Sequence, residues 1–234
     1  CGTGGDARNT FNISTASALV AAGAGVTVAK HGNRAMTSQS GSADVLKALG
    51  VNIEAPAAVV ERCIAEARIG FLFAPLMHQA MKHAIGPRRE IGVRTVFNVL
   101  GPLTNPAGAR RQLIGVYDAS LPPLIAAVLR NLGSERCLVV HGDDGLDEIT
   151  TTGETLVAEL GGGSIRQYTI ASEKFGIPVA AKQDLAGGEA AENARILRGV
   201  LEGEHGPARD IVLLNAGAAI YLGGRAVDLH KGLV

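Results

Sequence analysis

Short, continuous apolar runs alternate along this chain with longer segments whose apolar residues recur at helical spacing. A strand that is apolar at every position needs cover on both faces, as in a parallel sheet between two layers of helices. The alternation therefore predicts an α/β fold with a mostly parallel central sheet and helices on both faces. The predicted strands are residues 26–29, 51–53, 71–74, 112–117 and 136–142, and the predicted helices are residues 16–25, 42–50, 57–70, 76–86, 121–133, 192–204 and 210–224.

Length and composition limit the class of protein. The 234 residues are 47% hydrophobic and can bury a large core, so we treat residues 1–234 as one α/β domain. Lys and Arg together number 22, as do Asp and Glu, so no net charge favours binding to nucleic acid. No apolar stretch is long enough to span a bilayer. Cys1, Cys63 and Cys137 lack metal-ligand spacing and read as reduced thiols, which predicts a cytoplasmic protein.

The segment GTGGDARNTFNIST, residues 2–15, places three glycines and an acid ahead of a predicted helix. Glycines allow the backbone to approach a ligand closely, and the free N–H groups of a helix N-terminus attract anions. These features predict a cradle for phosphate or diphosphate, with Asn12, Ser14 and Thr15 at the first helical turn. The alternative is an ordinary glycine turn with a Ser or Thr cap, because glycine motifs alone are weak signals.

A second polar segment, AKHGNRAMTSQSGSAD, follows the predicted strand 26–29. Working residues of α/β sheets gather in loops at the carboxyl ends of strands. Cations here precede a series of hydroxyl side chains, a combination that suits a phosphorylated sugar, although a solvated polar loop would look the same. The polar residues are Lys30, His31, Asn33, Arg34, Thr37, Ser38, Ser40 and Ser42.

An acidic segment, GDDGLDE, follows the predicted strand 136–142 and brings Asp143, Asp144, Asp147 and Glu148 close together. Carboxylates this close repel one another unless a cation binds. Hard oxygen ligands favour Mg²⁺, which commonly bridges protein carboxylates and substrate phosphates. The alternative is a solvated acidic turn.

Arginines cluster in GPRREIGVRT, as Arg88, Arg89 and Arg94. A guanidinium can hold a carboxylate through two parallel hydrogen bonds, although exposed arginines on helices are common. His31 and His78 lie near these polar segments, and a lone histidine is more often structural than catalytic.

Taken together, these segments resemble the anthranilate phosphoribosyltransferases, a family of nucleoside phosphorylase-like, type III phosphoribosyltransferases. The resemblance covers nearly the whole chain, and the combination of KHGNR, GPLTNP and the Asp-Glu pair is its most specific part. The segments that carry it, in order, are GTGGD, TFNISTASALVAA, VAKHGNR, SGSADVLKALGVN, GFLFAPLMHQAMKH, VRTVFNVLGPLTNPA, GVYD, GLDEITTTGET, LAGGEAAENARILRGVL and LLNAGAAIYLGG.

The resemblance implies a reaction in tryptophan biosynthesis. Phosphoribosyl pyrophosphate and anthranilate would give N-(5-phosphoribosyl)anthranilate and diphosphate, with Mg²⁺ as cofactor. Displacement at the anomeric carbon needs stabilisation of the leaving charge and alignment of the aromatic amine. The amine is already a usable nucleophile, so we assign no catalytic protein nucleophile or base.

The family's functional positions map onto this chain residue by residue. The implied phosphoribosyl pyrophosphate-binding residues are Gly2, Gly5, Asp6, Thr10, Asn12, Ile13, Ser14, Thr15, Lys30, His31, Gly32, Asn33, Arg34, Ala35, Met36, Thr37, Ser38 and Ser42. The implied anthranilate-binding residues are Gly2, Asn33, His78 and Arg88. The implied metal-binding residues are Ser14, Asp147 and Glu148.

The chain also departs from the family pattern. Family members carry an N-terminal helical segment that forms the interface of a homodimer, and we expect that segment and the C-terminal helix to be missing here. Ala7, Gln39 and Gln79 stand where Gly, a basic residue and Pro are frequent. Three other interpretations stay open: a pyrimidine nucleoside phosphorylase-like enzyme, a nucleic-acid-binding relative without activity, and a structural domain without activity.

Overall fold

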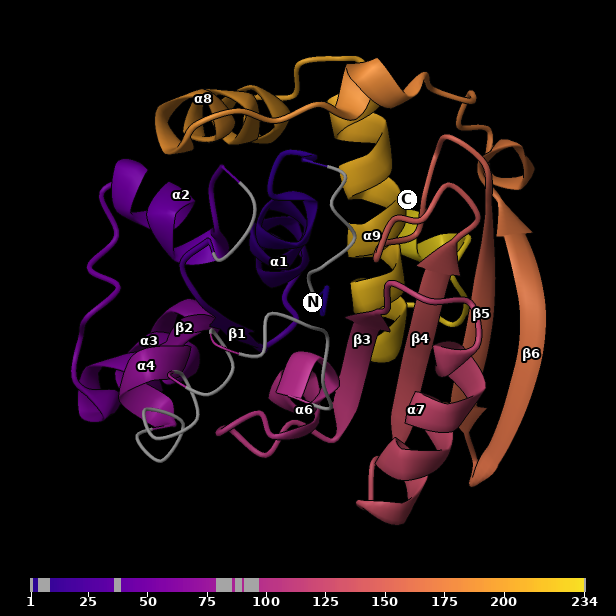
Figure 1. The fold of residues 1–234 in the computed structure, drawn as a ribbon, viewed down its shortest axis with the longest axis horizontal. Helices are drawn as coiled ribbons and strands as arrows, with labels where there is room; N and C mark the ends of the chain where they lie inside the picture. The colour runs from indigo at the N-terminus through magenta and orange to yellow at the C-terminus, as the bar shows by residue number, and fades with distance from the viewer. Residues whose placement is uncertain are drawn as a thin grey trace.

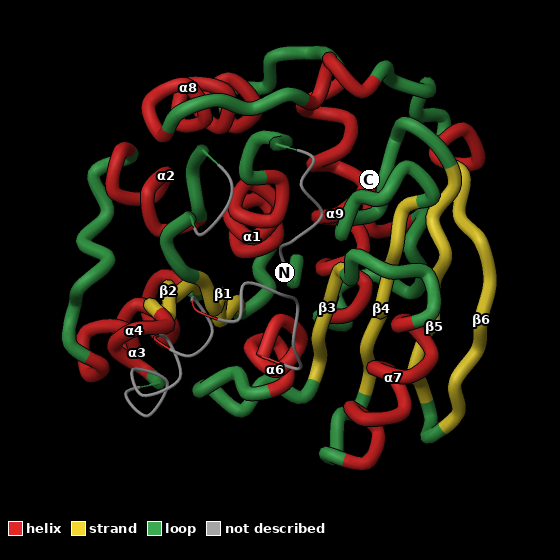
Figure 2. Tube along the Cα trace, viewed as in Figure 1, coloured by secondary structure: helices red, strands yellow, loops and turns green. Residues whose placement is uncertain are grey.

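The structure, a computed structural model, describes residues 2–3, 9–35, 39–78, 86, 90 and 97–233, and the statements below concern those residues. It confirms the α/β class. Figure 1 shows a four-stranded sheet on one side of the molecule and a pair of short strands on the other, with two helices between them. Figure 2 shows how loops connect these layers. None of the described helices has the length and apolar character needed to cross a membrane.

The larger sheet has the strand order β3-β4-β5-β6. Strands β3 (Arg111–Gly115) and β4 (Arg136–Gly142) are parallel, joined through helix α7 (Leu121–Asn131). Strands β5 (Glu154–Gly161) and β6 (Ser164–Ala171) continue the sheet in antiparallel pairing.

Helices cover both faces of this sheet, as predicted. Successive side chains of a strand point to opposite faces. Cys137 and Val139 of β4 pack with α7, whereas Leu138 and Val140 pack with helix α9 (Pro207–Leu222). The continuous apolar run of β4 therefore reflects burial on both sides.

No element was predicted for residues 154–171, which form β5 and β6. Half of the side chains of β6 are exposed, so its sequence lacks a continuous apolar run. The glycine run between the two strands forms a turn, in which Gly162 and Gly163 have φ of 57° and 79°. Positive φ at both central residues is typical of a two-residue hairpin turn.

The smaller sheet pairs β1 (Val28–Gly32) with β2 (Ile69–Phe73) in parallel. Helices α2 (Ser42–Ala48) and α3 (Ala57–Ala67) connect them, and the short helix α4 (Ala74–Met77) follows β2.

Several predicted boundaries need correction. The strand predicted at 26–29 lies two residues later, so Lys30 and His31 belong to β1 instead of following it. The predicted strand 51–53 is wrong, because the N–H of Val51 donates to Leu46 at the end of α2 and Ile53 lies in a turn. The helix predicted at 57–70 ends at Ala67, since Arg68 has φ of 60° and leads into β2.

Other predicted helices are confirmed with small shifts at their ends: α1 (Ile13–Gly23), α2, α7, α8 (Ala190–Leu201) and α9. Of the helix predicted at 76–86, residues 79–85 lie outside the described residues. Helix α6 (Phe97–Leu103) and the single-turn helices η2 (Ser172–Phe175), η3 (Lys182–Leu185) and η4 (Lys231–Leu233) were not predicted.

The core beneath the predicted phosphate cradle joins the two ends of the chain. Ile13 of α1 is buried together with Leu185, Leu197 of α8 and Ile211 of α9. The glycine-rich segment 2–15, called the glycine loop below, begins beside β3. There the N–H of Thr3 donates to the carbonyl of Gly115 at 2.9 Å. These contacts fix where α1 and the glycine loop begin.

Candidate active site

Five residues predicted to bind substrate or metal come together from separate parts of the chain. The Nζ atom of Lys30, in β1, donates to Ser14 Oγ at the start of α1 over 3.2 Å. Asp147 and Glu148, after β4, lie close enough to Lys30 for their charges to act on it. Gly2 adjoins Asp147, because a Cβ at Gly2 would overlap the Asp147 carboxylate.

The charges of this group are buried. Lys30, Asp147 and Glu148 are 7%, 8% and 7% exposed. Burial lowers the pKa of Lys30 from its ordinary 10.5 to about 8, although Glu148 and then Asp147 act in the opposite direction. The ammonium group therefore stays mostly protonated at neutral pH, as a buried cation beside two carboxylates.

The loop that carries these carboxylates, residues 142–152, is called the acidic loop below. Asp144 does not face Lys30. Its carboxylate accepts hydrogen bonds from the N–H of Leu146 (3.0 Å), from Thr150 Oγ1 (2.8 Å) and from Thr152 Oγ1. The carboxylate of Asp143 lies against Gly153 on an exposed part of the loop. The loop thus separates two carboxylates that act within its own structure from the two that face Lys30.

The donor set fits Mg²⁺. Among the described residues, no group of three or more His, Cys, Asp or Glu side chains could hold a metal ion alone. Mg²⁺ seldom needs such a group, because it keeps several waters and binds through one or two carboxylates together with substrate phosphates. Asp147, Glu148 and the hydroxyl of Ser14 could supply the protein's share of such a coordination sphere.

The start of α1 is less open than the sequence suggested. Asn12 precedes the helix, but its Nδ2 donates to the Ser40 carbonyl at 3.2 Å and its Oδ1 accepts from Asn193 Nδ2 at 3.0 Å. Ile13 and Thr15 are almost fully buried. Ser14 and Asn12 are partly exposed, while Thr10 pairs with Ala186 in an isolated bridge.

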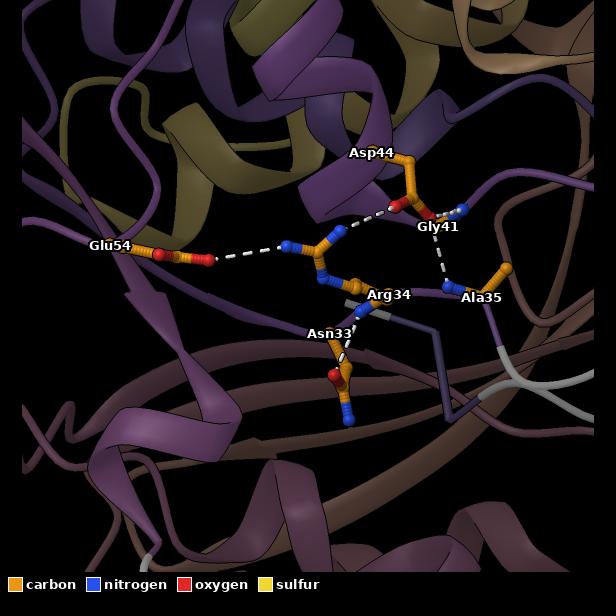
Figure 3. Close-up of polar contacts among 6 residues, drawn as sticks. All are labelled: Asn33, Arg34, Ala35, Gly41, Asp44 and Glu54. Atoms are coloured by element: carbon orange, nitrogen blue, oxygen red, sulfur yellow. Dashed lines mark hydrogen bonds and ion pairs between the residues drawn. The ribbon is translucent and has the colours of Figure 1, made fainter.

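The segment after β1, residues 33–35 and 39–44, is called the basic turn below (Figure 3). Arg34 points toward carboxylates, lying 3.2 Å from Glu54 and 3.8 Å from Asp44. Asp44 also accepts hydrogen bonds from the N–H groups of Ala35 (3.0 Å) and Gly41 (2.9 Å). A Cβ at Gly41 would overlap the Arg34–Ala35 backbone, so this turn requires glycine.

Three other predicted residues lie at the ends of this turn. Gly32 ends β1 against the ring of Phe71, which a Cβ would crowd. Asn33 is exposed, and its Oδ1 accepts a hydrogen bond from the N–H of Arg34 at 2.8 Å. Ser42 begins α2.

His31 and His78 form an edge-to-face pair with ring centroids 4.8 Å apart. The Nε2 atoms of both rings are buried and have no hydrogen-bond partner among the described residues. Burial, followed by the charges of His78 and Lys30, lowers the pKa of His31 from 6.5 to about 4, despite an opposing hydrogen bond with the Gly101 backbone. His31 is therefore neutral at physiological pH and leaves one ring nitrogen available to a ligand.

Other predicted site residues lie outside the described residues: Gly5, Asp6, Met36, Thr37, Ser38 and Arg88. Gly115, Asn193 and Asn215 support the site but were not predicted as functional residues, although the segments that contain them carry the family resemblance. A Cβ at Gly115 would overlap the carbonyl oxygen of Asp147. The local signal that could have pointed to Asn215 is its position as a polar residue within the apolar segment LLNAG of a predicted helix, where the structure buries it.

Comparison with known proteins identifies the family of this chain. Residues 1–234 match the family model described as the glycosyl transferase family, a/b domain. An anthranilate phosphoribosyltransferase from Alkaliphilus metalliredigens (strain QYMF) is 58% identical over 233 residues, which cover 100% of this chain and 69% of that protein. The chain belongs to the anthranilate phosphoribosyltransferase family. A second member, from Rubrobacter xylanophilus, is 59% identical over 234 residues, covering 100% of this chain and 68% of that one.

Solved structures of anthranilate phosphoribosyltransferases have the same fold. The enzyme from Thermus thermophilus superposes with a TM-score of 0.94 at 49% identity, covering 99% of this chain and 69% of that chain. The Saccharomyces cerevisiae enzyme in complex with PRPP and Mg gives a TM-score of 0.88 at 34% identity, covering 99% and 66%. The resemblance predicted from the sequence is confirmed, and the matches favour neither the nucleoside phosphorylase nor the nucleic-acid-binding interpretation.

Proposed function

We propose that this chain transfers the phosphoribosyl group of phosphoribosyl pyrophosphate to anthranilate, giving N-(5-phosphoribosyl)anthranilate and diphosphate in tryptophan biosynthesis. The observation that carries the proposal is the group formed by Ser14 and the buried Lys30, Asp147 and Glu148 beside Gly2. It combines a hydroxyl, a cation and two carboxylates where a helix begins, which suits a metal-bound diphosphate.

The reaction breaks the bond between the anomeric carbon and the diphosphate oxygen, and the electron pair leaves with diphosphate. The amine nitrogen of anthranilate forms the new bond to that carbon and then loses a proton. The protein's main task is to stabilise the leaving charge, which the ammonium of Lys30 does from a buried position. Mg²⁺, when held by Asp147, Glu148 and Ser14, supplies further positive charge to the diphosphate.

The acceptor amine needs alignment more than activation. Phosphoribosyl pyrophosphate lies along the glycine loop and the basic turn, and anthranilate lies beside Asn33 and His78. Supporting this placement, the Nε2 atoms of His31 and His78, which have no hydrogen-bond partner among the described residues, can offer polar contacts to a ligand. We propose that Arg88 binds the carboxylate of anthranilate through two parallel hydrogen bonds.

The whole protein acts as a homodimer in the cytoplasm under this proposal. Both properties stay predictions from the family resemblance.

The proposal is tested by incubating the intact protein with phosphoribosyl pyrophosphate, Mg²⁺ and anthranilate and following the loss of anthranilate fluorescence. We expect turnover that depends on Mg²⁺ and is abolished by the double substitution Asp147→Asn with Glu148→Gln. The matched control is Glu173→Gln, which changes an exposed carboxylate outside the site and leaves turnover unchanged. Turnover of uridine with inorganic phosphate, in place of anthranilate transfer, would overturn the proposal.

A further inference from the structure

A fully buried asparagine in helix α9 holds the acidic loop through hydrogen bonds. Asn215 lies within α9 and is 0% exposed. Its Oδ1 accepts a hydrogen bond from the N–H of Ile149 at 3.0 Å, and its Nδ2 donates to the carbonyl of Ile149 at 2.8 Å. The side-chain amide thus pairs with both main-chain polar groups of one residue, and it also donates to Ile211 of its own helix at 2.9 Å.

Ile149 directly follows Asp147 and Glu148, so this pairing fixes the two peptide units that flank Ile149. Asp144 holds the same loop on both sides of the two carboxylates, through Leu146 before them and Thr150 after them. Buried hydrogen bonds of this kind cannot be exchanged for bonds to water, so they fix the backbone more firmly than exposed ones.

We infer that Asn215 is a positioning residue for the metal site, and that its amide sets the orientation of Glu148 and Asp147 toward Lys30 and Mg²⁺. This inference rests on the proposed function. An apolar side chain at position 215 would leave the N–H and C=O of Ile149 unpaired in the interior. The loop would then have to move to satisfy them, and the carboxylates would move with it. Groups behind the ligands of a metal site typically change its affinity by about 10- to 100-fold when removed.

The test measures Mn²⁺ binding to the intact protein at saturating phosphoribosyl pyrophosphate, from the electron paramagnetic resonance signal of free Mn²⁺ and against a blank without protein. Thermal melting of each variant without ligand is recorded alongside. The main variant is Asn215→Leu, which keeps the size of the side chain and removes its hydrogen bonds. Asn215→Ser, which is smaller and retains one hydroxyl, serves if the leucine variant does not fold.

Two control variants separate positioning from stability. Leu129→Ala removes a buried apolar side chain of α7, from a core cluster that contains no residue of the acidic loop. Glu159→Leu removes a buried polar side chain whose hydrogen bonds go to Arg166, Tyr168 and Tyr221 instead of the acidic loop. Both should melt at lower temperature and keep the Mn²⁺ affinity of the parent protein.

We expect Asn215→Leu to raise the dissociation constant for Mn²⁺ by about 10- to 100-fold, and Asn215→Ser to raise it less. Equal Mn²⁺ affinity in Asn215→Leu and the parent protein would overturn the inference and leave Asn215 a purely structural residue, as would an equal loss of affinity in Leu129→Ala or Glu159→Leu. Failure of the parent protein to bind Mn²⁺ with phosphoribosyl pyrophosphate would instead overturn the proposed function.

Discussion

The acidic loop and the basic turn both carry charged residues of the proposed site, but they are held in different ways. Asp144 and Thr150 of the acidic loop are buried, and so is Asn215, which holds the loop from α9. At the basic turn, Arg34 forms an ion pair with Glu54, and their side chains are 46% and 63% exposed. One region is fixed by interior hydrogen bonds and the other largely by charges at the surface.

This difference teaches what each region can do during a reaction. An exposed ion pair contributes about 0–1 kcal/mol, so a ligand can replace it at small cost. Losing one partner of a buried hydrogen bond costs about 1–3 kcal/mol for each group left unpaired. Under the proposed function, the acidic loop therefore provides a fixed frame for the metal and the leaving diphosphate, and the basic turn can adjust to substrate.

The largest expected effect comes from Gly115→Ala, which tests the fixed frame directly. The new Cβ would overlap the carbonyl oxygen of Asp147, which belongs to the backbone and cannot rotate away. The acidic loop must therefore shift, and a displacement of this size costs roughly 100-fold in kcat/KM. Steady-state kinetics with anthranilate measure it. The control Gly161→Ala places its Cβ in open space, and activity should not change. Full activity in Gly115→Ala would show that the loop is free to move.

The next effect is on stability. Asp144→Ala leaves Leu146 N–H, Thr150 and Thr152 without their acceptor. We expect the free energy of unfolding, measured in urea, to fall by about 2–4 kcal/mol. Asp143→Ala, in the same loop but exposed, should change stability by less than about 0.5 kcal/mol. Equal losses in the two variants would contradict the division of the loop into interior and surface carboxylates.

A smaller effect should appear in the pH dependence of stability, through His31 at the end of β1. The pKa of His31 is about 4 in the folded protein and 6.5 in the unfolded chain. Between these values the unfolded chain binds a proton that the folded protein does not, so stability falls as pH falls from 6.5 toward 4.

His31→Gln removes this titrating group. The parent protein should therefore lose roughly 1–3 kcal/mol more than the variant between pH 7 and pH 4.5, as measured by urea unfolding at each pH. Parallel pH profiles for the two proteins would mean that His31 titrates normally in the folded state.

The smallest effect is expected in the basic turn. Glu54→Gln breaks the ion pair with Arg34 and should cost less than about 1 kcal/mol at low salt. In about 1 M NaCl the difference should vanish, because the Debye length falls to about 3 Å. The cost of Asp144→Ala should persist in the same salt. A salt-independent loss above about 2 kcal/mol in Glu54→Gln would remove the contrast between the two regions.

Local sequence patterns predicted the helices and strands whose burial leaves a regular repeat in the sequence. The apolar run of β4 and the periodicity of α7 identified both elements. Strand β4 is buried on both faces and helix α7 on one, and each kind of burial leaves its own pattern in the local sequence. The motifs named Lys30, Asp147 and Glu148, and the structure brings them together. The strand predicted at 51–53 was wrong, because these residues, of which only Val51 and Ile53 are apolar, continue from the end of α2 into a turn.

What could not be predicted depends on contacts between distant segments. Asn215 lies far along the chain from Ile149, and nothing in LLNAG specifies that partner. Gly115 reads as an ordinary glycine after a strand until the Asp147 backbone is placed against it. The frame of the site is therefore a property of the fold, whereas its chemistry is already visible in the motifs.

The packing of α1 against α9 has a consequence for biosynthesis. A ribosome delivers α1 well before α9, yet Ile13 of α1 is buried together with Ile211 of α9. Chains fold as they emerge, N-terminal end first. The helix that begins the phosphate cradle must therefore wait, with its apolar face uncovered, until translation has passed Ile211. A stalled or shortened nascent chain would expose this face to chaperones and proteases and would hold no working site.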